Sequence, residues 1–212
     1  MRTKAAVLYA INEPLVIEEV EIGDPKDREV LVRMTATGVC RSDLSAARGF
    51  GRPHLPVILG HEAAAEVVKC GPGVTRVKPG DRIVLSWSPN CGHCFYCLEA
   101  RPTLCEVYTE AAGVGTLWDG TSRIRTPGGD KIHHFSQTSS FAEHMVVPEA
   151  GCVPIHPDIP ASIAALVGCA VTTGYGAAVN DANVRARTNV AIWGIGGVGL
   201  NVIQALRIAG SP

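Results

Sequence analysis

Four cysteines are concentrated in one short segment of the chain, at Cys91, Cys94, Cys97 and Cys105. Their spacing is C-x2-C-x2-C-x7-C, and Gly92 and Pro102 allow the backbone to wrap around a single bound ion. Four thiolates in a tetrahedral arrangement are a common structural site for Zn²⁺, and such a site has no open position for a substrate. The segment therefore predicts a zinc-stapled loop over residues 91–105 that supports folding and takes no part in catalysis.

Two other chemistries are compatible with four thiols, namely two disulfide bonds or an iron–sulfur cluster. Disulfides are disfavoured because the apolar run after Met1 is soon followed by polar residues and is too short for a secretory signal peptide. The iron–sulfur cluster stays open as an alternative. Eight cysteines without such a signal favour metal ligation in a reducing compartment, so we expect a cytoplasmic location.

Three further metal-binding side chains, Cys40, His61 and Cys169, lie far apart in the sequence. Considered singly, a cysteine most often packs as a small apolar residue, and a histidine most often makes a structural hydrogen bond. Considered together, the three supply two thiolates and one imidazole, which leaves one position on a zinc ion open for water or substrate. Cys70 and Cys152 match no ligand spacing, and we expect both to pack in the interior.

A glycine-rich turn near the end of the chain, Gly194-Ile-Gly196-Gly197-Val198-Gly199, has the pattern G-x-G-x-x-G. It follows a predicted buried strand at residues 190–193 and precedes a predicted helix that ends near Ala209. In this context the glycines permit a tight turn close to a pyrophosphate, and the helix N-terminus offers free N–H groups. The pattern predicts a dinucleotide-binding turn, whose confirming acidic residue is expected about 20 residues further on, beyond Pro212.

The elements that must position these residues are short β-strands. We predict strands at residues 5–9, 15–20, 30–37, 63–68, 82–86 and 141–148, separated by turns rich in Gly and Pro. Many short strands with such turns are typical of a β-barrel or sandwich. The character changes at residues 158–179, where an alanine-rich run with Pro160 near its start predicts a helix.

The composition limits the partners of the chain. It has 212 residues, 46% of them hydrophobic and 18% charged, with a formal net charge of -1. Near-neutral charge without a basic run argues against nucleic acid or an acidic membrane as a partner. We also find no apolar run that approaches the roughly 20 residues of a membrane helix, so we expect no membrane association.

Five motifs follow one another along the chain: Gly-Val-Cys-Arg-Ser-Asp, Gly-His-Glu, Cys-Gly-x-Cys-x-x-Cys, Gly-Cys-x-x-x-Thr-Gly-Tyr-Gly and Gly-x-Gly-Gly-Val-Gly. They occur in this order in zinc-dependent medium-chain alcohol dehydrogenases, a family that the chain resembles over essentially its whole length. Segments at 119–123, 133–135 and 175–180 are most similar to the glutathione-dependent formaldehyde dehydrogenase branch and its bacterial relatives. The resemblance implies a β-rich GroES-like barrel with a zinc-stapled lobe at residues 1–170, followed by the first βα unit of a Rossmann domain at 171–212.

The resemblance also implies a role for each matching residue. The catalytic zinc would be held by Cys40, His61 and Cys169, and Glu62 would lie beside the metal. Asp43 would hydrogen-bond His61 and fix its orientation, while the Ser42 hydroxyl would carry the alcohol proton outward. Arg41 would contact the coenzyme pyrophosphate and Thr173 the nicotinamide. The remaining coenzyme contacts would come from Gly194, Gly196, Gly197, Val198 and Gly199.

An enzyme of this kind transfers a hydride between an alcohol, or a hydroxymethyl-thiol adduct, and a nicotinamide coenzyme. The resemblance implies two zinc ions per chain, NAD, a small alcohol or aldehyde as substrate, and a homo-oligomer for a full-length form. Two alternatives stay open: a polyol or amino-alcohol dehydrogenase with similar zinc motifs, and a non-catalytic zinc-binding barrel.

Two departures from the family limit these expectations. Ser45 stands where many members carry a relay histidine, so the proton route beyond Ser42 is unassigned. Members of the family also continue well beyond the position that corresponds to Pro212. We therefore expect the 212-residue chain to be an N-terminal fragment or truncated product that is inactive or incomplete alone.

Overall fold

Five strands of the protein form a closed β-barrel. The structure is a computed structural model that describes residues 1–211. The barrel strands, in hydrogen-bonded order, are β1 (Arg2–Leu8), β2 (Val16–Ile22), β7 (Ile124–Arg125), β8 (Lys131–His134) and β4 (Val57–Ile58). Alternate residues of these strands point inward, so that Val7, Val20 and Ile132 are fully buried in one apolar core.

A five-stranded antiparallel sheet packs on the same core. Its strands, in order, are β10 (Cys152–Pro154), β6 (Arg82–Leu85), β5 (Glu62–Cys70), β3 (Glu29–Gly38) and β9 (His144–Pro148). The register pairs the last residue of β3, Gly38, with the first residue of β5, Glu62. The segments that carry Cys40 and His61 therefore leave the sheet at the same edge, although they are far apart in the sequence.

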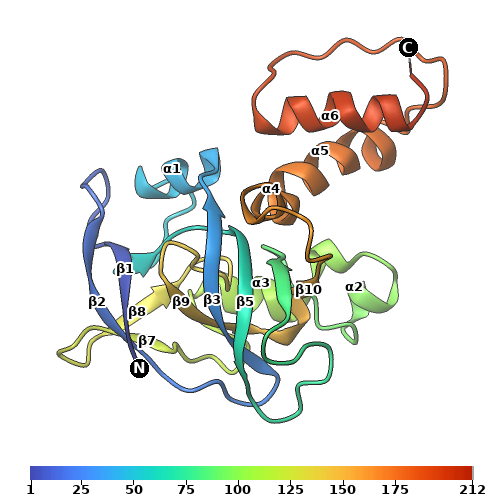
Figure 1. Ribbon diagram of the computed structural model, residues 1–212. Coiled ribbons are helices and arrows are strands. Elements are labelled where there is room, and N and C mark those ends of the chain that lie inside the picture. The colour runs from blue at the N-terminus through green and yellow to red at the C-terminus, as the bar shows by residue number, and fades with distance from the viewer. Residues whose placement is uncertain (212) are drawn as a thin grey trace.

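Ten helical segments complete the described part of the chain, and α4 and η3 among them pack on the five-stranded sheet. They are α1 (Arg41–Ala47), α2 (Phe95–Leu98), η1 (Pro102–Leu104), α3 (Glu106–Gly113), η2 (Glu149–Gly151), α4 (Ala161–Leu166), η3 (Val167–Val171), α5 (Thr172–Gly176), η4 (Ala177–Asp181) and α6 (Gly197–Ile208). Figure 1 shows α4 and α5 leaving the barrel toward the upper right, with α6 alongside them and the α2 segment at the right of the barrel. The helical turns from Ala161 to Asp181 are continuous, with π-helical stretches at η3 and η4.

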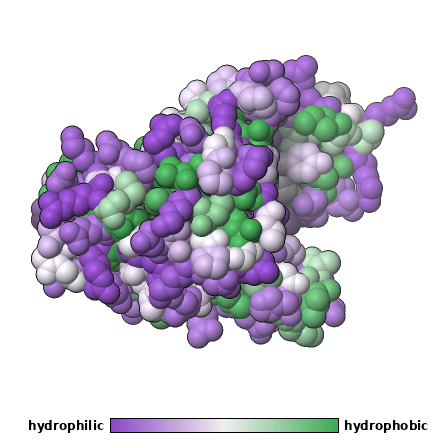
Figure 2. All heavy atoms as spheres, turned by 60° about the horizontal axis from the view of Figure 1, so that its bottom comes forward, coloured by the Kyte–Doolittle hydropathy of each residue, from purple (hydrophilic) through white to green (hydrophobic). Residues whose placement is uncertain are grey.

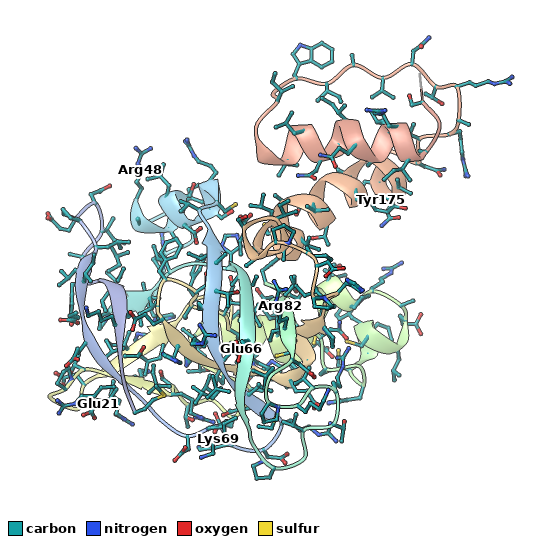
Figure 3. All side chains as sticks on the ribbon, in the orientation of Figure 1. Glu21, Arg48, Glu66, Lys69, Arg82 and Tyr175 are labelled. Atoms are coloured by element: carbon teal, nitrogen blue, oxygen red, sulfur yellow. The ribbon has the colours of Figure 1, made fainter. Side chains whose placement is uncertain are left out.

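The junction between the barrel and α4 is fixed by a side chain of the sheet. Arg82 of β6 donates hydrogen bonds to the carbonyl oxygens of Pro157 and Ile159, the latter at 2.8 Å. Figure 3 shows Arg82 beside the chain that leads into α4. The two bonds hold the linker against the sheet, which limits how far the helical segment can move relative to the barrel.

The predicted strands of the barrel and sheet are confirmed, and the predicted helix at 158–179 is present as α4 to η4. The predicted buried strand at 190–193 is wrong: these residues pair with no strand within the described chain, and Trp193 is 88% exposed. A strand needs a hydrogen-bonded neighbour, and none lies beside this segment in residues 1–211. The helix that follows is present as α6, and Gly210 terminates it with a φ of +79°.

The expectation that no apolar run reaches membrane-spanning length is also wrong. Residues 161–181 form a 21-residue helix that contains an 18-residue window with a mean hydropathy of 1.5. By length and composition alone, such a helix could cross a membrane. Core helices of proteins that never enter a membrane pass the same test, and this helix carries Cys169. Figure 2 shows one face of the molecule, on which hydrophobic residues occur in small groups between hydrophilic ones.

A buried ion pair joins the start of β3 to the turn before β7. Arg123 and Glu29 are 5% and 6% exposed, and two parallel bonds of 2.8 and 2.5 Å connect the guanidinium to the carboxylate. Asp119 also accepts from Arg123 at 2.8 Å and from Lys26 at 2.8 Å. Burial alone would lower the pKa of Arg123, but the carboxylates of Glu29 and Asp119 outweigh it and raise the pKa.

Replacement of Arg123 by methionine is expected to lower the free energy of unfolding by about 3 kcal/mol or more, because Glu29 would remain buried without its cation. Arg125→Met is the matched control, since Arg125 is exposed and donates only to the Gly129 carbonyl at 3.0 Å. Such a surface change is expected to cost less than about 0.5 kcal/mol. Urea unfolding of both variants measures the difference. Equal losses in the free energy of unfolding would show that the buried ion pair stabilises the fold no more than a surface residue does.

Candidate functional site

A buried carboxylate holds together the two segments that leave the sheet edge. Asp43 is 2% exposed and is the third residue of α1. Its Oδ2 accepts from the backbone N–H of Cys40 at 2.9 Å, and its Oδ1 accepts from the N–H of Gly60 at 3.1 Å and from His61 Nδ1 at 3.0 Å. The bond back to Cys40 caps the helix and explains why α1 begins at Arg41.

The bond from Asp43 determines which nitrogen of His61 is available. Because an ionised carboxylate can only accept, Nδ1 must carry the hydrogen, and the lone pair of the neutral ring lies on Nε2. The hydrogen bond expected between Asp43 and His61 is therefore present, and it leaves Nε2 able to bind a metal.

Four potential metal-binding atoms converge at this place. Cys40, His61, Glu62 and Cys169 each offer one ligand atom, and these atoms all lie within 4.8 Å of one another. His61 and Glu62 are 4% and 3% exposed, whereas Cys40 is half-buried, so the cluster lies where the interior meets the surface. Two sulfurs and one imidazole nitrogen suit Zn²⁺ in ligand type and would leave one of four tetrahedral positions open, with the Glu62 carboxylate beside them. The residues therefore fit a zinc ion.

The second thiol of the cluster, that of Cys169, reaches it because a helix packs very tightly on the sheet. Cys169 lies in the π-helical stretch η3, and π-helical turns often occur at functional sites. A Cβ added at the preceding residue, Gly168, would lie 2.1 Å from the carbonyl oxygen of Leu85 in β6. Only glycine allows this approach, which brings Cys169 to the edge occupied by Cys40 and His61.

The position of the Glu62 carboxylate also depends on a glycine, because the facing residue Gly38 has no side chain to occupy the same space. A Cβ added at Gly38, its partner across β3 and β5, would lie 2.1 Å from Glu62 Oε2. Any other residue at position 38 would displace the carboxylate from the metal cluster.

The electrostatics of the cluster follow from its burial and its partners. Burial alone would lower the pKa of His61, but the hydrogen bonds and charges of Asp43 and Cys169 outweigh it and raise the pKa to about 11. Burial likewise opposes ionisation of Cys40, yet the N–H and hydroxyl of Ser42 together with His61 lower the pKa of this thiol. Burial raises the pKa of the Cys169 thiol. A divalent cation bound at the cluster would replace the protons of these thiols and of His61 Nε2.

A cavity of about 410 Å³ lies beside the cluster, between α1, the end of α3 and the chain after β8. Ser42 lines it, and the Ser42 hydroxyl oxygen is 3.7 Å from Cys40 Sγ. Phe135 forms another wall, with its ring edge-on to His61 at a centroid distance of 5.8 Å. A larger hollow of about 590 Å³ near Met1 contains none of the expected site residues and is remote from this chemistry.

The four cysteines of the 91–105 loop also converge. Their sulfurs all lie within 4.8 Å of one another, and Cys91 Sγ is 3.9 Å from Cys97 Sγ. Backbone N–H groups point at the sulfurs: Cys91 N is 3.3 Å from Cys105 Sγ, and Cys94 N is 3.3 Å from Cys91 Sγ. The N–H groups of Cys97 and Glu106 lower the pKa of the Cys94 thiol to about 7. Such a set of thiolates suits a closed tetrahedral zinc site.

The glycine-rich turn lies next to the helix that carries Cys169. Gly194 has a φ of +91°, and Gly196 caps α6, so the first N–H groups of the helix are unpaired within it. A Cβ at Gly199 would lie 2.0 Å from the Gly194 carbonyl, and one at Gly197 would contact the Ala170 side chain at 3.8 Å. Arg41 and Thr173 are both exposed.

Sequence reasoning missed two features of the site. Phe135, which packs on His61, was noted only as part of a resembling segment. The loop that follows holds the turn before His61: Thr138 and Ser140 donate to the Gly60 carbonyl at 3.1 and 3.0 Å. A Cβ at Gly60, which has a φ of +91°, would lie 2.4 Å from Ser140 Oγ. The glycine before a metal-binding histidine was the one available signal of such a constrained turn.

A family model and two curated relatives that the chain matches are all dehydrogenases of the same kind. The family described as "Alcohol dehydrogenase GroES-like domain" matches residues 26–157. The chain is 43% identical to an alcohol dehydrogenase class-3 of Cereibacter sphaeroides and 41% identical to an S-(hydroxymethyl)glutathione dehydrogenase of Paracoccus denitrificans. Both matches cover 100% of this chain and 56% of the relative, so the chain spans about half the length of these proteins.

Solved structures show the same fold. An alcohol dehydrogenase zinc-binding domain protein from Burkholderia ambifaria matches with a TM-score of 0.94 and 35% identity, over 100% of this chain and 57% of that one. Benzyl alcohol dehydrogenase from Acinetobacter calcoaceticus matches with a TM-score of 0.90 and 31% identity, again over 100% and 57%.

Two separate donor sets predict two zinc ions per chain. Cys40→Ala is expected to reduce the zinc content from about two to about one, because it removes a ligand from the His61 cluster alone. Cys70→Ala is the matched control, since Cys70 is a free thiol outside both clusters and should leave the content at two. Elemental analysis of metal-replete protein measures this, and a content of one in the unaltered chain that Cys40→Ala does not change would exclude the His61 site.

The 91–105 cluster should contribute mainly to folding. Cys97→Ser is expected to lose zinc and stability together, because metal binding in such a loop contributes to the folding free energy. A loss of about 3 kcal/mol would lower the Tm of a chain of this size by about 6–12 °C. Calorimetry with and without a chelator measures it. A Tm that equals that of Cys70→Ala under both conditions would show that the loop is not stabilised by metal.

Proposed function

Because the chain belongs to the alcohol dehydrogenase family with a GroES-like domain, we propose that it forms the metal-binding part of an oxidoreductase. The reaction is the transfer of a hydride from an alcohol to NAD, which gives an aldehyde, NADH and one proton. The names of the curated relatives, alcohol dehydrogenase class-3 and S-(hydroxymethyl)glutathione dehydrogenase, support an alcohol or hydroxymethyl-thiol substrate. Residues 1–170 would form the catalytic domain and residues 171–212 part of a dinucleotide-binding domain, in a cytoplasmic protein.

The observation that carries this proposal is a donor set with a cavity beside it. Cys40, His61 and Cys169 would hold the zinc ion, with the Glu62 carboxylate next to it. When bound, this ion acts as a Lewis acid that stabilises negative charge on the oxygen of the substrate. The cavity of about 410 Å³ is lined by Ser42 and Phe135, which lie against Cys40 and His61, so a ligand in it would lie near the cluster.

Asp43 has a positioning role in this proposal. It accepts from Nδ1 of His61 and from the backbone on both sides of the cluster, so it fixes the ring orientation and the tautomer. Hydrogen bonds of this kind from the outer side of a metal-binding histidine typically contribute 10–100-fold to metal affinity or activity.

Ser42 is the group that would take up the proton of the alcohol. Its hydroxyl lines the cavity and lies 3.7 Å from Cys40 Sγ, within the shell around the metal-binding atoms. A hydroxyl can accept one hydrogen bond while it donates another, as a proton relay requires. Ser45 and His54 line the same cavity, so both lie along the space through which the proton would leave.

The coenzyme would lie on the α6 side of the site. Gly194, Gly196 and Gly199 form the turn, and the first N–H groups of α6 at Gly197 and Val198 would face the pyrophosphate. The exposed side chains of Arg41 and Thr173 would contact the coenzyme.

Cobalt substitution tests the open metal site directly. With Co²⁺ in place of zinc, the visible absorption spectrum reports changes among the ligands of the ion. Addition of a primary alcohol should change the spectrum of the unaltered chain and leave that of Cys40→Ala unchanged. A spectrum that no alcohol or aldehyde perturbs would mean that the His61 cluster has no accessible position, and the proposed function would then fail.

Ser42→Ala should lower the rate of alcohol oxidation by about 10²–10⁴, the usual contribution of a general acid–base group, while the zinc content stays the same. The assay is NADH formation by a form of the protein extended to the length of its relatives, under conditions in which hydride transfer limits the rate. Ser42→Thr retains a hydroxyl and should retain most of the rate. If the alanine and threonine variants turn over equally, Ser42 does not carry the proton.

A further inference from the structure

One strand of the sheet holds the helical segment α4–η3 at two separate points. At the start of β6, Arg82 donates hydrogen bonds to the carbonyl oxygens of Pro157 and Ile159 in the linker before α4. At the end of β6, the carbonyl oxygen of Leu85 would lie 2.1 Å from a Cβ added at Gly168. The segment is therefore attached to β6 at its entry and again at the residue before the cysteine of the metal cluster.

The guanidinium of Arg82 bonds the linker because its nearest acidic neighbour is already paired. Arg82 lies directly opposite Glu66 in the register of β5 and β6, a position in which opposite charges commonly interact. Glu66 instead accepts from Arg33 at 2.6 Å, and no acid among residues 1–211 lies within 4.0 Å of Arg82. Figure 3 labels both residues, and Arg82 is the one nearer to α4.

The linker at residues 156–160 has no other hydrogen-bonded attachment to the barrel. All five of its residues are exposed, and Pro157 and Pro160 have no N–H to donate. Its remaining bonds are internal or lead into α4, such as the bond from the N–H of Ile159 to the His156 carbonyl at 3.1 Å. Among the described residues, the hydrogen bonds that join this linker to the sheet thus come from Arg82 alone.

The packing of α4 on the sheet is made mostly by alanines. The contact consists of Ala161, Ala164 and Ala165 of the helix and of Ala36, Ala64, Val84 and Ile155. A single methyl group allows close approach but makes far fewer van der Waals contacts than a larger side chain. The orientation of α4 therefore depends strongly on the bonds that hold its linker.

Cys169 is the metal-binding residue whose position depends on this orientation. Cys40 and His61 are held by Asp43, independently of the linker. At a helical rise of 1.5 Å per residue, Cys169 lies roughly 12 Å along the helix from its start, so a tilt of about 5° would move its sulfur by roughly 1 Å. Metal–ligand distances are satisfied within about 0.2 Å, so such a tilt would weaken binding.

We propose that Arg82 is a positioning residue for the metal site. By holding the linker before α4, it fixes the place of Cys169 and so raises the affinity of the His61 cluster for zinc, although it does not touch the cluster. The inference rests on the proposed function for the identity of the site, whereas the attachment of the linker itself does not depend on metal.

Competition of a chelator for zinc tests the proposal on the 212-residue chain. It measures an affinity for each of the two clusters, and the constant that Cys40→Ala removes belongs to the His61 cluster. Arg82→Met should weaken that constant by about 10- to 100-fold, comparable to the effect of other groups that orient a ligand from outside the metal. The constant of the four-cysteine loop should stay unchanged.

Two further variants separate positioning from a loss of charge. Arg82→Lys retains a cation that can donate to one of the two carbonyls, and its affinity should lie between those of the unaltered chain and Arg82→Met. Lys69→Met is the matched control, because Lys69 of β5 bonds the exposed Asp24 at 2.6 Å and should leave both constants unchanged. Unchanged affinity of the His61 cluster in Arg82→Met, or equal losses at both clusters, would overturn the proposal.

Hydrogen exchange supplies a measurement that needs no metal at the His61 cluster. In a Cys40→Ala background, with zinc in the four-cysteine loop alone, Arg82→Met should accelerate amide exchange at residues 161–169 by about tenfold, and Lys69→Met should not. Faster exchange together with zinc binding that never depends on Cys40 would confirm the hold on the linker and contradict the proposed metal site. Zinc binding that depends on Cys40 but not on Arg82 would leave the proposed function in place and contradict the role of Arg82.

Discussion

The site depends on one buried carboxylate. Asp43 accepts three N–H hydrogen bonds, which come from the residue before α1, from the turn before β5 and from the ring of His61. A carboxylate at 2% exposure is tolerated only when such bonds replace its hydration. Since Cys40 and His61 are both held by it, two of the three expected zinc-binding residues have a common anchor. The rest of the cluster is built around that anchor.

Glycines at close contacts complete the arrangement. Gly38 leaves room for the Glu62 carboxylate, and Gly168 lets the helix of Cys169 approach the backbone of β6 to a distance that no side chain would permit. Gly174 has the same function between α5 and α6, where a Cβ would lie 2.7 Å from the Asn201 Cβ. Because the glycine-rich turn of α6 packs against Ala170, the residue after Cys169, the metal site and the turn belong to one packed unit.

Much of this could be predicted from the sequence, and the failures have physical causes. The strands and the long helix follow from local patterns, and the metal-binding residues follow from ligand type and family resemblance. The strand at 190–193 was wrong because a buried apolar run acquires strand structure only with a hydrogen-bonded neighbour, which local pattern cannot supply. The cavity depends on how α1, α3 and the chain after β8 meet, which no local pattern encodes.

The central claim is that Cys40, His61 and Cys169 hold an accessible zinc ion that is distinct from the ion of the four-cysteine loop. Diffraction from crystals of zinc-loaded protein, measured on both sides of the zinc absorption edge, tests it most directly. The account predicts two anomalous peaks per chain. One should lie among four sulfurs, and the other should be bound by two sulfurs and by Nε2 of His61, with Nδ1 still hydrogen-bonded to Asp43. A single peak among the four cysteines, or a second ion bound through Nδ1, would contradict the account.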